Sequence, residues 1–370
     1  MSAVRTAPEP VRRGGITVRP PRVLVANRQH PSALDEPVDA ARVRQLERDG
    51  VLDRPPEPSA VVYQVTAGQH RQTGVLVEVS VGDYRDGRIR RHEGTQPERV
   101  RRLDEFTEAN GTEQVPVTLT HPARAGLRAL LAEITAGEPD VRLPTGEGLT
   151  HSVWIRPEPL VAQAIQDELD DVETLYVADG HHRMAAAERY AGRRGQPGTF
   201  TLAALFPSDE MRILGYPRCV PRPVGVSTPR LLGTLAGLPA VARIEEFAPP
   251  ESIRPARGEI SMYLDNRWYR LWLRRPRGNG RAGLDVVTLD EDIIASVFGV
   301  TDAGHTPLPG ASDAAAIAGW CAEHDGVGLL ARPPDVEQVM AVSDAGEVMP
   351  PKSTWFDPKA SSELFVREIG

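Results

Sequence analysis

The chain has 370 residues, of which 40% are hydrophobic and 25% charged, and its formal net charge is −8 at neutral pH. This is the composition of a globular protein with a sizeable core and room for two or three domains or one large one. The acidic balance argues against broad binding of duplex nucleic acid, but it permits a local basic site for a small anion. No run of roughly 18 apolar residues occurs, so we expect neither a membrane span nor a membrane partner.

The N-terminal segment and the cysteines bear on the expected compartment. Residues 1–15 contain Arg and Pro but lack the apolar stretch of a secretory signal, so we interpret them as a disordered tail. Cys219 and Cys321 lie far apart in the sequence and form no CxxC pattern. We therefore expect free, reduced thiols in a cytoplasmic protein.

Strand-like and helix-like segments alternate along the chain. Apolar alternation predicts strands at 60–66, 73–80, 152–156, 174–178, 201–206, 212–214, 240–247, 259–264, 268–274 and 326–330. Helical periodicity predicts helices at 38–49, 97–110, 122–136, 159–169, 184–190, 231–236, 290–298, 311–323 and 336–343. We expect a turn at 83–87, a loop at 137–148 and an irregular segment at 350–359.

Two of these predictions rest on specific local signals. Thr95 and Glu98 have capping-box spacing around Pro97, and Asn110-Gly111 is a typical helix end. The face that this helix is expected to bury carries Val100, Leu103 and Phe106. Asp265-Asn266 lies between two alternating segments, which is the strongest hairpin signal in the chain. A change of composition at 275–281 is a weak indication of a domain boundary.

The most informative stretch is Asp-Gly-His-His-Arg at 179–183, between a predicted strand and a predicted helix. Backbone N–H groups and the positive end of the helix dipole point outward at a helix N-terminus, and such ends bind phosphates. Asp179 can cap the helix, Gly180 permits close approach of a ligand, and Arg183 supplies a planar fork for phosphate. The stretch predicts a phosphate site, and the alternative is a purely structural connection.

A metal site is the other alternative at this stretch. His181 and His182 are adjacent, so on a helix their side chains point about 100° apart and do not readily bind the same ion. The spacing His-x-x-x-His of a helical zinc site is absent. We therefore predict no metal site from a direct motif.

His92-Glu93 and Lys352 are further candidate site residues. Glu93 lies just before a predicted helix, where it is either a solvated turn residue or a general base for a substrate hydroxyl. Lys352-Ser353-Thr354 resembles the end of a Walker loop, but the upstream glycines are missing. A lysine that reaches a phosphate from a C-terminal loop remains an alternative to an ordinary surface lysine.

Residues 177–183 resemble a motif of a bacterial and archaeal family, domain-of-unknown-function family 1015. Residues 89–116 resemble the central motif of this family, and 337–359 resemble its C-terminal signature. The central motif is built here on His92, Glu93, Thr95, Arg102, Leu103 and Asn110. The resemblance extends from about residue 18 to residue 369.

The family is similar to free-serine kinases of the ParB/sulfiredoxin fold, which share a His-Glu segment and a later Asp-Gly-His-x-Arg turn. This resemblance implies an α+β protein whose ParB/sulfiredoxin-like core spans 16–274, with an insertion near 113–168 and a C-terminal α/β region at 275–370. It implies ATP or ADP as donor, Mg²⁺ as cofactor, and a homodimer as one option. It also assigns roles to residues. Glu93 is the implied base, Asp179 assists magnesium or the hydroxyl, His92 contacts substrate, and the phosphates are held by Gly180, His181, His182 and Arg183.

The expected function is therefore phosphoryl transfer to the hydroxyl of free L-serine or a related amino acid. A nucleotide-binding regulator of ParB type and a noncatalytic scaffold are the alternatives. The scaffold is favoured by two departures from the family pattern, at Val25–Arg28 and at Gly215–Arg218, where a histidine is missing. A sulfiredoxin-type reductase is disfavoured because no cysteine occupies the phosphate turn.

Overall fold

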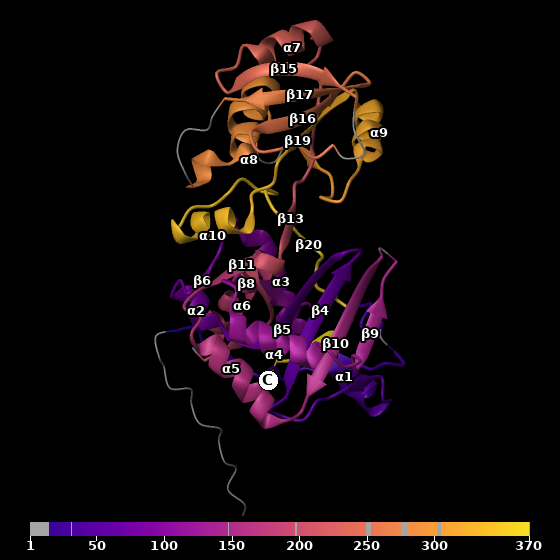
Figure 1. The fold of residues 1–370 in the computed structure, drawn as a ribbon. Helices are drawn as coiled ribbons and strands as arrows, with labels where there is room; N and C mark the ends of the chain where they lie inside the picture. Colours follow the sequence, from indigo (N-terminus) through magenta and orange to yellow (C-terminus); the bar gives the residue numbers. More distant parts are fainter. Residues whose placement is uncertain are drawn as a thin grey trace, which may run out of the picture. The chain divides into compact units, whose positions relative to one another are not determined.

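The computed structural model describes residues 15–30, 32–146, 148–196, 198–248, 253–274, 280–301 and 305–369 (Figure 1). The expected tail at 1–15 lies outside the described residues except for Gly15. The segment 275–281, which suggested a domain boundary, is described only from residue 280 onward. Helices and several sheets make up the chain, so the mixed α and β class that we predicted is confirmed at this level.

The described chain divides into two compact units. Unit 1 consists of the chain up to Arg91, Thr95–Met211, and the residues from Pro358 onward. Unit 2 consists of His92–Gly94 and Arg212–Asp357. The division does not fall near residue 275, because strands on both sides of that point are hydrogen-bonded into one sheet of unit 2.

The main sheet of unit 1 has nine strands in the order β6-β11-β8-β12-β5-β4-β10-β9, and β1 pairs with β5. Their bounds are β1 Val18–Arg19, β4 Ala60–Ala67, β5 His70–Ser80, β6 Ile89–Arg90, β8 Val117–His121, β9 Val141–Pro144, β10 Leu149–Arg156, β11 Leu175–Asp179 and β12 Phe200–Pro207. A second sheet combines β2 Leu24–Ala26, β3 Leu52–Asp53, β7 Thr112–Glu113 and β21 Phe365–Glu368. Strands β8 and β10 lie within the main sheet, so the expected insertion near 113–168 contributes to the core of this unit.

The helices of unit 1 are α1 Ala40–Arg48, α2 Val81–Arg85, α3 Pro97–Asn110, α4 Ala125–Thr135, α5 Pro159–Asp170 and α6 His181–Arg194, with a 3-10 turn, η1 Ser208–Glu210. Leu131 of α4, Ile165 of α5 and Met184 of α6 pack in one core cluster with alternate residues of the sheet strands. On the other face, the ring of Tyr63 meets Phe365 of β21 at a centroid distance of 5.1 Å. The sheet is therefore buried on both faces, because successive strand residues point to opposite sides.

The pairing of β8 with β11 and with β12 shows which residues lie at each end of the main sheet. Strand β11 runs antiparallel to β8, with Asp179 opposite Thr118 near the start of β8. Strand β12 runs parallel to β8, with Pro207 opposite His121 at the end of both strands. Asp179 and His121 therefore lie at opposite ends of the sheet.

Unit 2 contains a six-stranded sheet in the order β15-β17-β16-β19-β14-β18 and a two-stranded sheet of β13 and β20. Their bounds are β13 Arg212–Leu214, β14 Arg218–Pro221, β15 Val241–Phe247, β16 Glu259–Leu264, β17 Arg267–Leu273, β18 Thr306–Pro307, β19 Gly326–Ala331 and β20 Trp355–Asp357. The helical segments are α7 Thr228–Ala236, η2 Gly280–Gly283, α8 Asp285–Val287, the π-helix η3 Thr288–Phe298, α9 Ala314–His324 and α10 Val336–Asp344. Cys219 and Cys321 are both buried in this unit and are free, as predicted.

The predicted hairpin at Asp265-Asn266 is confirmed. Both residues have a positive φ, 54° and 59°, which is the geometry of the two-residue turn that joins twisted antiparallel strands. Strands β16 and β17 pair from Leu264 and Arg267 outward. Local turn chemistry was sufficient to predict this element.

Other local predictions were wrong. The capping box at Thr95 does not form, because Gln96 is the N-cap of α3 and no side chain caps it. Phe106 is 42% exposed, and Asp104 is buried instead because it pairs with Arg189 and Arg193 of α6. The expected turn at 83–87 overlaps helix α2, the expected loop at 137–148 contains β9, and the expected irregular segment at 350–359 contains β20.

Candidate functional site

The Asp-Gly-His-His-Arg stretch joins strand β11 to helix α6 in unit 1, as the sequence predicts. Gly180 is the N-cap of α6 and has a φ of +95°, a conformation that L residues with a Cβ rarely adopt. Its carbonyl accepts the first helical hydrogen bond, from the N–H of Met184 at 2.9 Å. Gly180 has no side chain with which to cap the helix, and Asp179 precedes it, so the predicted capping role of Asp179 is wrong. N–H groups at a helix N-terminus are donors suited to an anion.

Gly180 also leaves room for the side chain of Arg183. A Cβ at position 180 would lie 2.7 Å from Nη2 and 2.9 Å from Nε of Arg183. Arg183 is therefore folded back over the turn at a place where only glycine fits. Its Nη2 donates to the carbonyl oxygen of Pro116 at 3.3 Å, which fixes the guanidinium beside the helix end.

Asp179 holds two cations at the end of β11. Its carboxylate accepts a hydrogen bond from Nη2 of Arg183 at 2.9 Å and one from Nζ of Lys359 at 2.5 Å. Burial alone would raise the pKa of Asp179, but the nearby charges of Arg183 and Lys359 outweigh it and lower the pKa to about 2. Asp179 is therefore an ionised anchor for both cations at neutral pH.

This pairing predicts a specific acid sensitivity. An unfolded aspartate titrates near pH 3.9, so ionised Asp179 stabilises the fold above about pH 4, and this contribution is lost as the pH falls toward 2. Asp179→Asn should lower the free energy of unfolding at neutral pH by roughly 1–2 kcal/mol and should flatten the acid loss of stability between about pH 4 and 2. Urea unfolding across this range measures both effects. Asp170→Asn, at the exposed end of α5, is the control, and parallel acid curves for wild type and Asp179→Asn would contradict the assignment.

The two histidines of the stretch have different surroundings. The side chain of His181 is buried in unit 1. His182 accepts a hydrogen bond at Nε2 from the backbone N–H of Gln96, the N-cap of α3, at 3.1 Å. The neighbouring imidazoles thus face different elements, in agreement with the argument against a shared metal ion.

His92 and Glu93 belong to unit 2, where they pair with the C-terminal signature. Glu93 forms a parallel β-bridge with Met349, and the N–H of Met349 donates to the carbonyl of His92 at 2.8 Å. The imidazole of His92 is buried, with Nε2 2.9 Å from Oγ1 of Thr354. The two sequence motifs that lie far apart in the chain are therefore joined in one unit. The contact of His92 with substrate that the resemblance implies stays a prediction.

Lys352 also belongs to unit 2. Its backbone is left-handed, with a φ of 60°, and its Nζ lies 5.4 Å from the ring centre of Tyr216. This distance is within the range of a cation–π contact. Tyr216 lies in the stretch 215–218, where the sequence departs from the family pattern. Its ring also meets Trp355 at a centroid distance of 5.2 Å.

Comparison with known proteins places the chain in a family. A family model described as "Protein of unknown function (DUF1015)" matches residues 27–292. The chain belongs to this family. A search of the curated proteins found no match.

Solved structures similar to this DUF1015 protein include SbnI with a C-terminal truncation from Staphylococcus aureus, at 15% identity and a TM-score of 0.41, covering 77% of this chain and 84% of that one. A free serine kinase in complex with AMP has 15% identity and a TM-score of 0.37, covering 79% and 91%. A variant of a free serine kinase in complex with ADP has 16% identity and a TM-score of 0.37, covering 79% and 92%. AMP and ADP are the ligands of those proteins.

Lys359 is the site residue that sequence reasoning missed. It lies 180 residues beyond its partner Asp179, and no local pattern marks the pair. Its backbone is fixed by Gln72, whose Nε2 donates to the carbonyl oxygen of Pro358 at 3.0 Å. The one available signal was the position of Lys359 at the end of the C-terminal signature of the family.

The described part of the DUF1015 protein contains no cluster of three or more histidine, cysteine, aspartate or glutamate side chains suited to a metal ion. Asp179 is shared by two cations, which leaves its oxygens little capacity for a third. Among the described helices, none combines the length and apolar character needed to cross a bilayer.

Proposed function

We propose that this protein transfers a phosphoryl group from ATP or ADP to the hydroxyl of free L-serine or a related small amino acid, on a core of ParB/sulfiredoxin type. The observation that carries the proposal is the start of α6. The helix is entered through the left-handed Gly180, and Arg183 is held beside this turn by Asp179. The sequence resemblance to free-serine kinases supplies the acceptor.

The start of α6 suits the terminal phosphates of a nucleotide. Backbone N–H groups at a helix N-terminus donate to phosphate oxygens, and the helix dipole favours their negative charge. The guanidinium of Arg183 adds charge-assisted donors of fixed geometry. Lys359 adds a second cation on the other oxygen of Asp179. Together these groups offset the charge of a diphosphate or triphosphate.

Glu93 is the base in this proposal. The acceptor hydroxyl oxygen attacks the terminal phosphorus, the bond from that phosphorus to the bridging oxygen breaks, and ADP or AMP leaves with the electron pair. The carboxylate of Glu93 takes the hydroxyl proton. The bridge to Met349 and the bond from His92 to Thr354 hold the backbone of Glu93 in place.

Magnesium, which the resemblance implies, is brought to the site by the nucleotide in this proposal. It neutralises charge on the phosphate oxygens that bind it. Asp179 is the carboxylate of the turn, but Arg183 and Lys359 already engage its oxygens. We therefore assign Asp179 the role of orienting these two cations.

The same pairing favours a second candidate, a nucleotide-binding regulator that carries out no transfer. An Asp179 that is committed to Arg183 and Lys359 is suited to binding phosphates but provides neither a base nor an open metal ligand. In that case Glu93 has no catalytic role, and the bound nucleotide acts as a switch.

A direct assay separates the two candidates. The full chain is incubated with ATP or ADP, Mg²⁺ and each hydroxy amino acid, and phospho-amino acid is measured by mass spectrometry. The kinase is supported by a phosphorylated serine or related amino acid together with an equal amount of ADP or AMP. Nucleotide binding without any transfer supports the regulator, and absence of nucleotide binding contradicts both.

Arg183→Ala should weaken nucleotide binding. Loss of a charge-assisted hydrogen bond is expected to cost roughly 1–3 kcal/mol, or about 5- to 150-fold in Kd. Isothermal titration calorimetry with ATP and ADP measures this change. Arg102→Ala removes an arginine that is 74% exposed on α3 and should leave the affinity unchanged. Equal affinities of wild type and Arg183→Ala for nucleotide would show that Arg183 does not contribute to nucleotide binding.

A further inference from the structure

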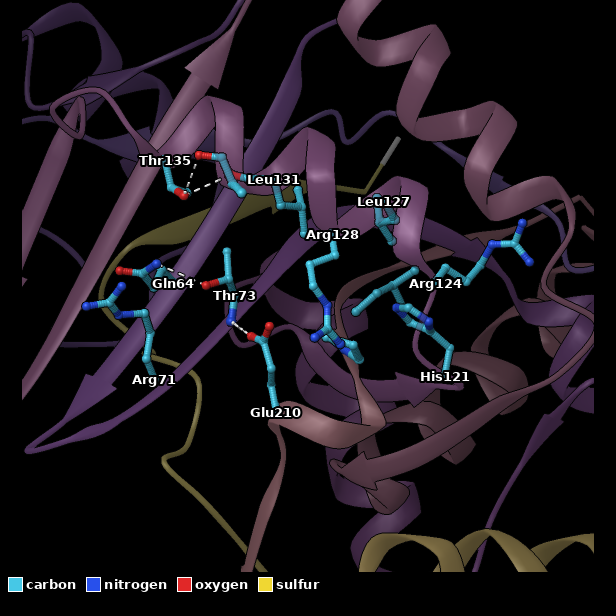
Figure 2. A pocket seen from close by; sticks show the side chains of 13 residues that line it. Gln64, Arg71, Thr73, His121, Arg124, Leu127, Arg128, Leu131, Thr135 and Glu210 are labelled. Carbon is cyan, nitrogen blue, oxygen red and sulfur yellow. Dashed lines mark hydrogen bonds between the residues drawn. The ribbon is translucent and has the colours of Figure 1, made fainter.

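A cavity lies at the end of the main sheet of unit 1 that is remote from Asp179, where β8 and β12 end (Figure 2). It has a volume of about 320 Å³ and is formed by α4, the ends of strands β4, β5, β8 and β12, and the turn η1. This volume lies at the lower end of the range for sites that bind small molecules. Because Asp179 lies at the opposite end of β8, the cavity is separate from the turn at Gly180.

Three arginines, Arg71, Arg124 and Arg128, line the cavity. Arg128 reaches in from α4 and pairs with Asp209, and Arg71 lines the wall from β5. Arg124 is also present, but its Nη2 is bonded to Asp171 at 2.7 Å. Arg124 is the N-cap of helix α4, so the helix N-terminus with its N–H donors lies at this end. A carboxylate is the group that such donors bind.

Two hydrogen-bond acceptors face the same cavity. Glu210 reaches in from η1, opposite Arg128, and its Oε2 accepts from the N–H of Thr73 at 2.7 Å (Figure 2). Burial raises the pKa of Glu210, and the N–H of Thr73 and the charge of Arg128 act in the opposite direction.

The second acceptor is His121, which is completely buried. Its Nδ1 lies 2.8 Å from the carbonyl oxygen of Pro122, so Nδ1 must carry the proton and donate. Burial lowers the pKa of His121 and keeps the ring neutral, so Nε2 has a lone pair. This Nε2 is buried and has no hydrogen-bond partner within the described residues. A buried polar atom without a partner is costly, and a ligand donor would satisfy it.

Part of the remaining wall is apolar, and Gln64, Thr73 and Thr135 also line the cavity. Leu127 and Leu131 of α4 and Leu205 of β12 line the cavity, and all three belong to the core of unit 1. A ligand of the cavity therefore needs an apolar body of a few carbon atoms in addition to its polar groups.

We propose that this cavity binds a free α-amino acid with an aliphatic side chain. Arg128 binds the carboxylate, Glu210 and Nε2 of His121 accept hydrogen bonds from the ammonium group, and the leucines contact the side chain. The cations and the acceptors together favour a zwitterion over a simple anion, since a lone carboxylate offers no donor to Nε2 of His121 and brings a second negative charge to Glu210. The site is additional to the serine site of the proposed kinase.

Three ligands of one shape test the proposal on the full wild-type chain. L-leucine carries both charged groups, 4-methylpentanoate lacks the ammonium group, and L-leucinamide lacks the carboxylate. Isothermal titration calorimetry should give L-leucine an affinity at least about tenfold higher than that of either analogue, because each lacks one charge-assisted contact. No binding of L-leucine at about 10 mM, or equal affinity for the three ligands, would overturn the proposal.

Two variants test which side chain contacts the ammonium group of the ligand and which contacts its carboxylate. Glu210→Gln should reduce the preference for L-leucine over 4-methylpentanoate to less than about threefold, and Arg128→Gln should do the same for its preference over L-leucinamide. Arg102→Gln, on the exposed side of α3, should leave both ratios unchanged. A preference that persists in Glu210→Gln would contradict the zwitterion site.

A third variant tests the role of His121, and thermal unfolding shows whether the variant is folded. His121→Phe replaces the imidazole with a slightly larger apolar ring, removes Nε2, and should lower the affinity for L-leucine at least about fivefold while thermal unfolding stays cooperative. Unchanged affinity in this variant would contradict the role of His121. Nucleotide titration of the same variants should match wild type, so failure of the amino-acid site and failure of the proposed kinase are distinguishable.

Discussion

Glu93→Gln is expected to lower the rate of phosphoryl transfer to serine by roughly 10²- to 10⁴-fold, which is the usual contribution of a general base. The amide has nearly the same shape as the carboxylate but cannot take the hydroxyl proton. The surrounding backbone should be preserved, because it is held by the bridge to Met349 and by the bond between His92 and Thr354. Nucleotide affinity should therefore remain within about twofold of wild type.

Single-turnover kinetics and calorimetry on the same preparation separate these two effects. Glu98→Gln is the matched control, because Glu98 is an exposed glutamate a short distance along the chain that pairs with Arg101 and Arg102 of the same helix. It should change neither the rate nor the affinity. A rate within tenfold of wild type for Glu93→Gln would show that another group accepts the proton.

Gly180→Ala is expected to weaken nucleotide binding by roughly 10- to 100-fold and to lower the free energy of unfolding by about 1–2 kcal/mol. The loss of stability follows from the φ of +95°, which is strained for any residue with a Cβ. The loss of affinity follows from the position of the new methyl group, 2.7 Å from Nη2 of Arg183, which would push the guanidinium away from Asp179. Nucleotide titration and urea unfolding measure the two effects separately.

Gly50→Ala is the control that separates backbone strain from crowding. Gly50 also has a positive φ, +69°, but a Cβ there would meet no atom within 4 Å. It should lower stability by a similar amount and leave nucleotide affinity unchanged. If Gly180→Ala binds nucleotide as tightly as Gly50→Ala does, the position of Arg183 is irrelevant to binding.

The elements that could be predicted from the sequence are those set by neighbouring residues. The hairpin at Asp265-Asn266 follows from two residues that tolerate a positive φ between alternating strands. The end of α3 at Gly111 and the change from β11 to α6 at Gly180 follow in the same way from glycine at a helix boundary. The candidate turn itself was therefore found from the sequence, including the glycine and the arginine that shape it.

The failures arose where a charge or a distant strand replaced the expected local contact. The face of α3 that is buried contains Asp104, because two arginines of α6 neutralise it, and hydrophobic periodicity does not reveal such a partner. The strand β9 exists because it pairs with β10, although its segment reads as a loop. The limits of the two units likewise depend on which strands pair.

The sequence by itself determined the turn at Gly180, since a left-handed residue between an apolar strand and a helix constrains only adjacent backbone. Only the tertiary structure decided that Asp179 binds Lys359, 180 residues away, and that His92 meets Thr354, 262 residues away. It also decided that Glu210 and His121 line one cavity. The physical reason is the sequence separation over which each interaction acts. Dihedral preferences act between neighbouring residues, whereas ion pairs and cavities depend on which distant parts of the chain come into contact when it folds.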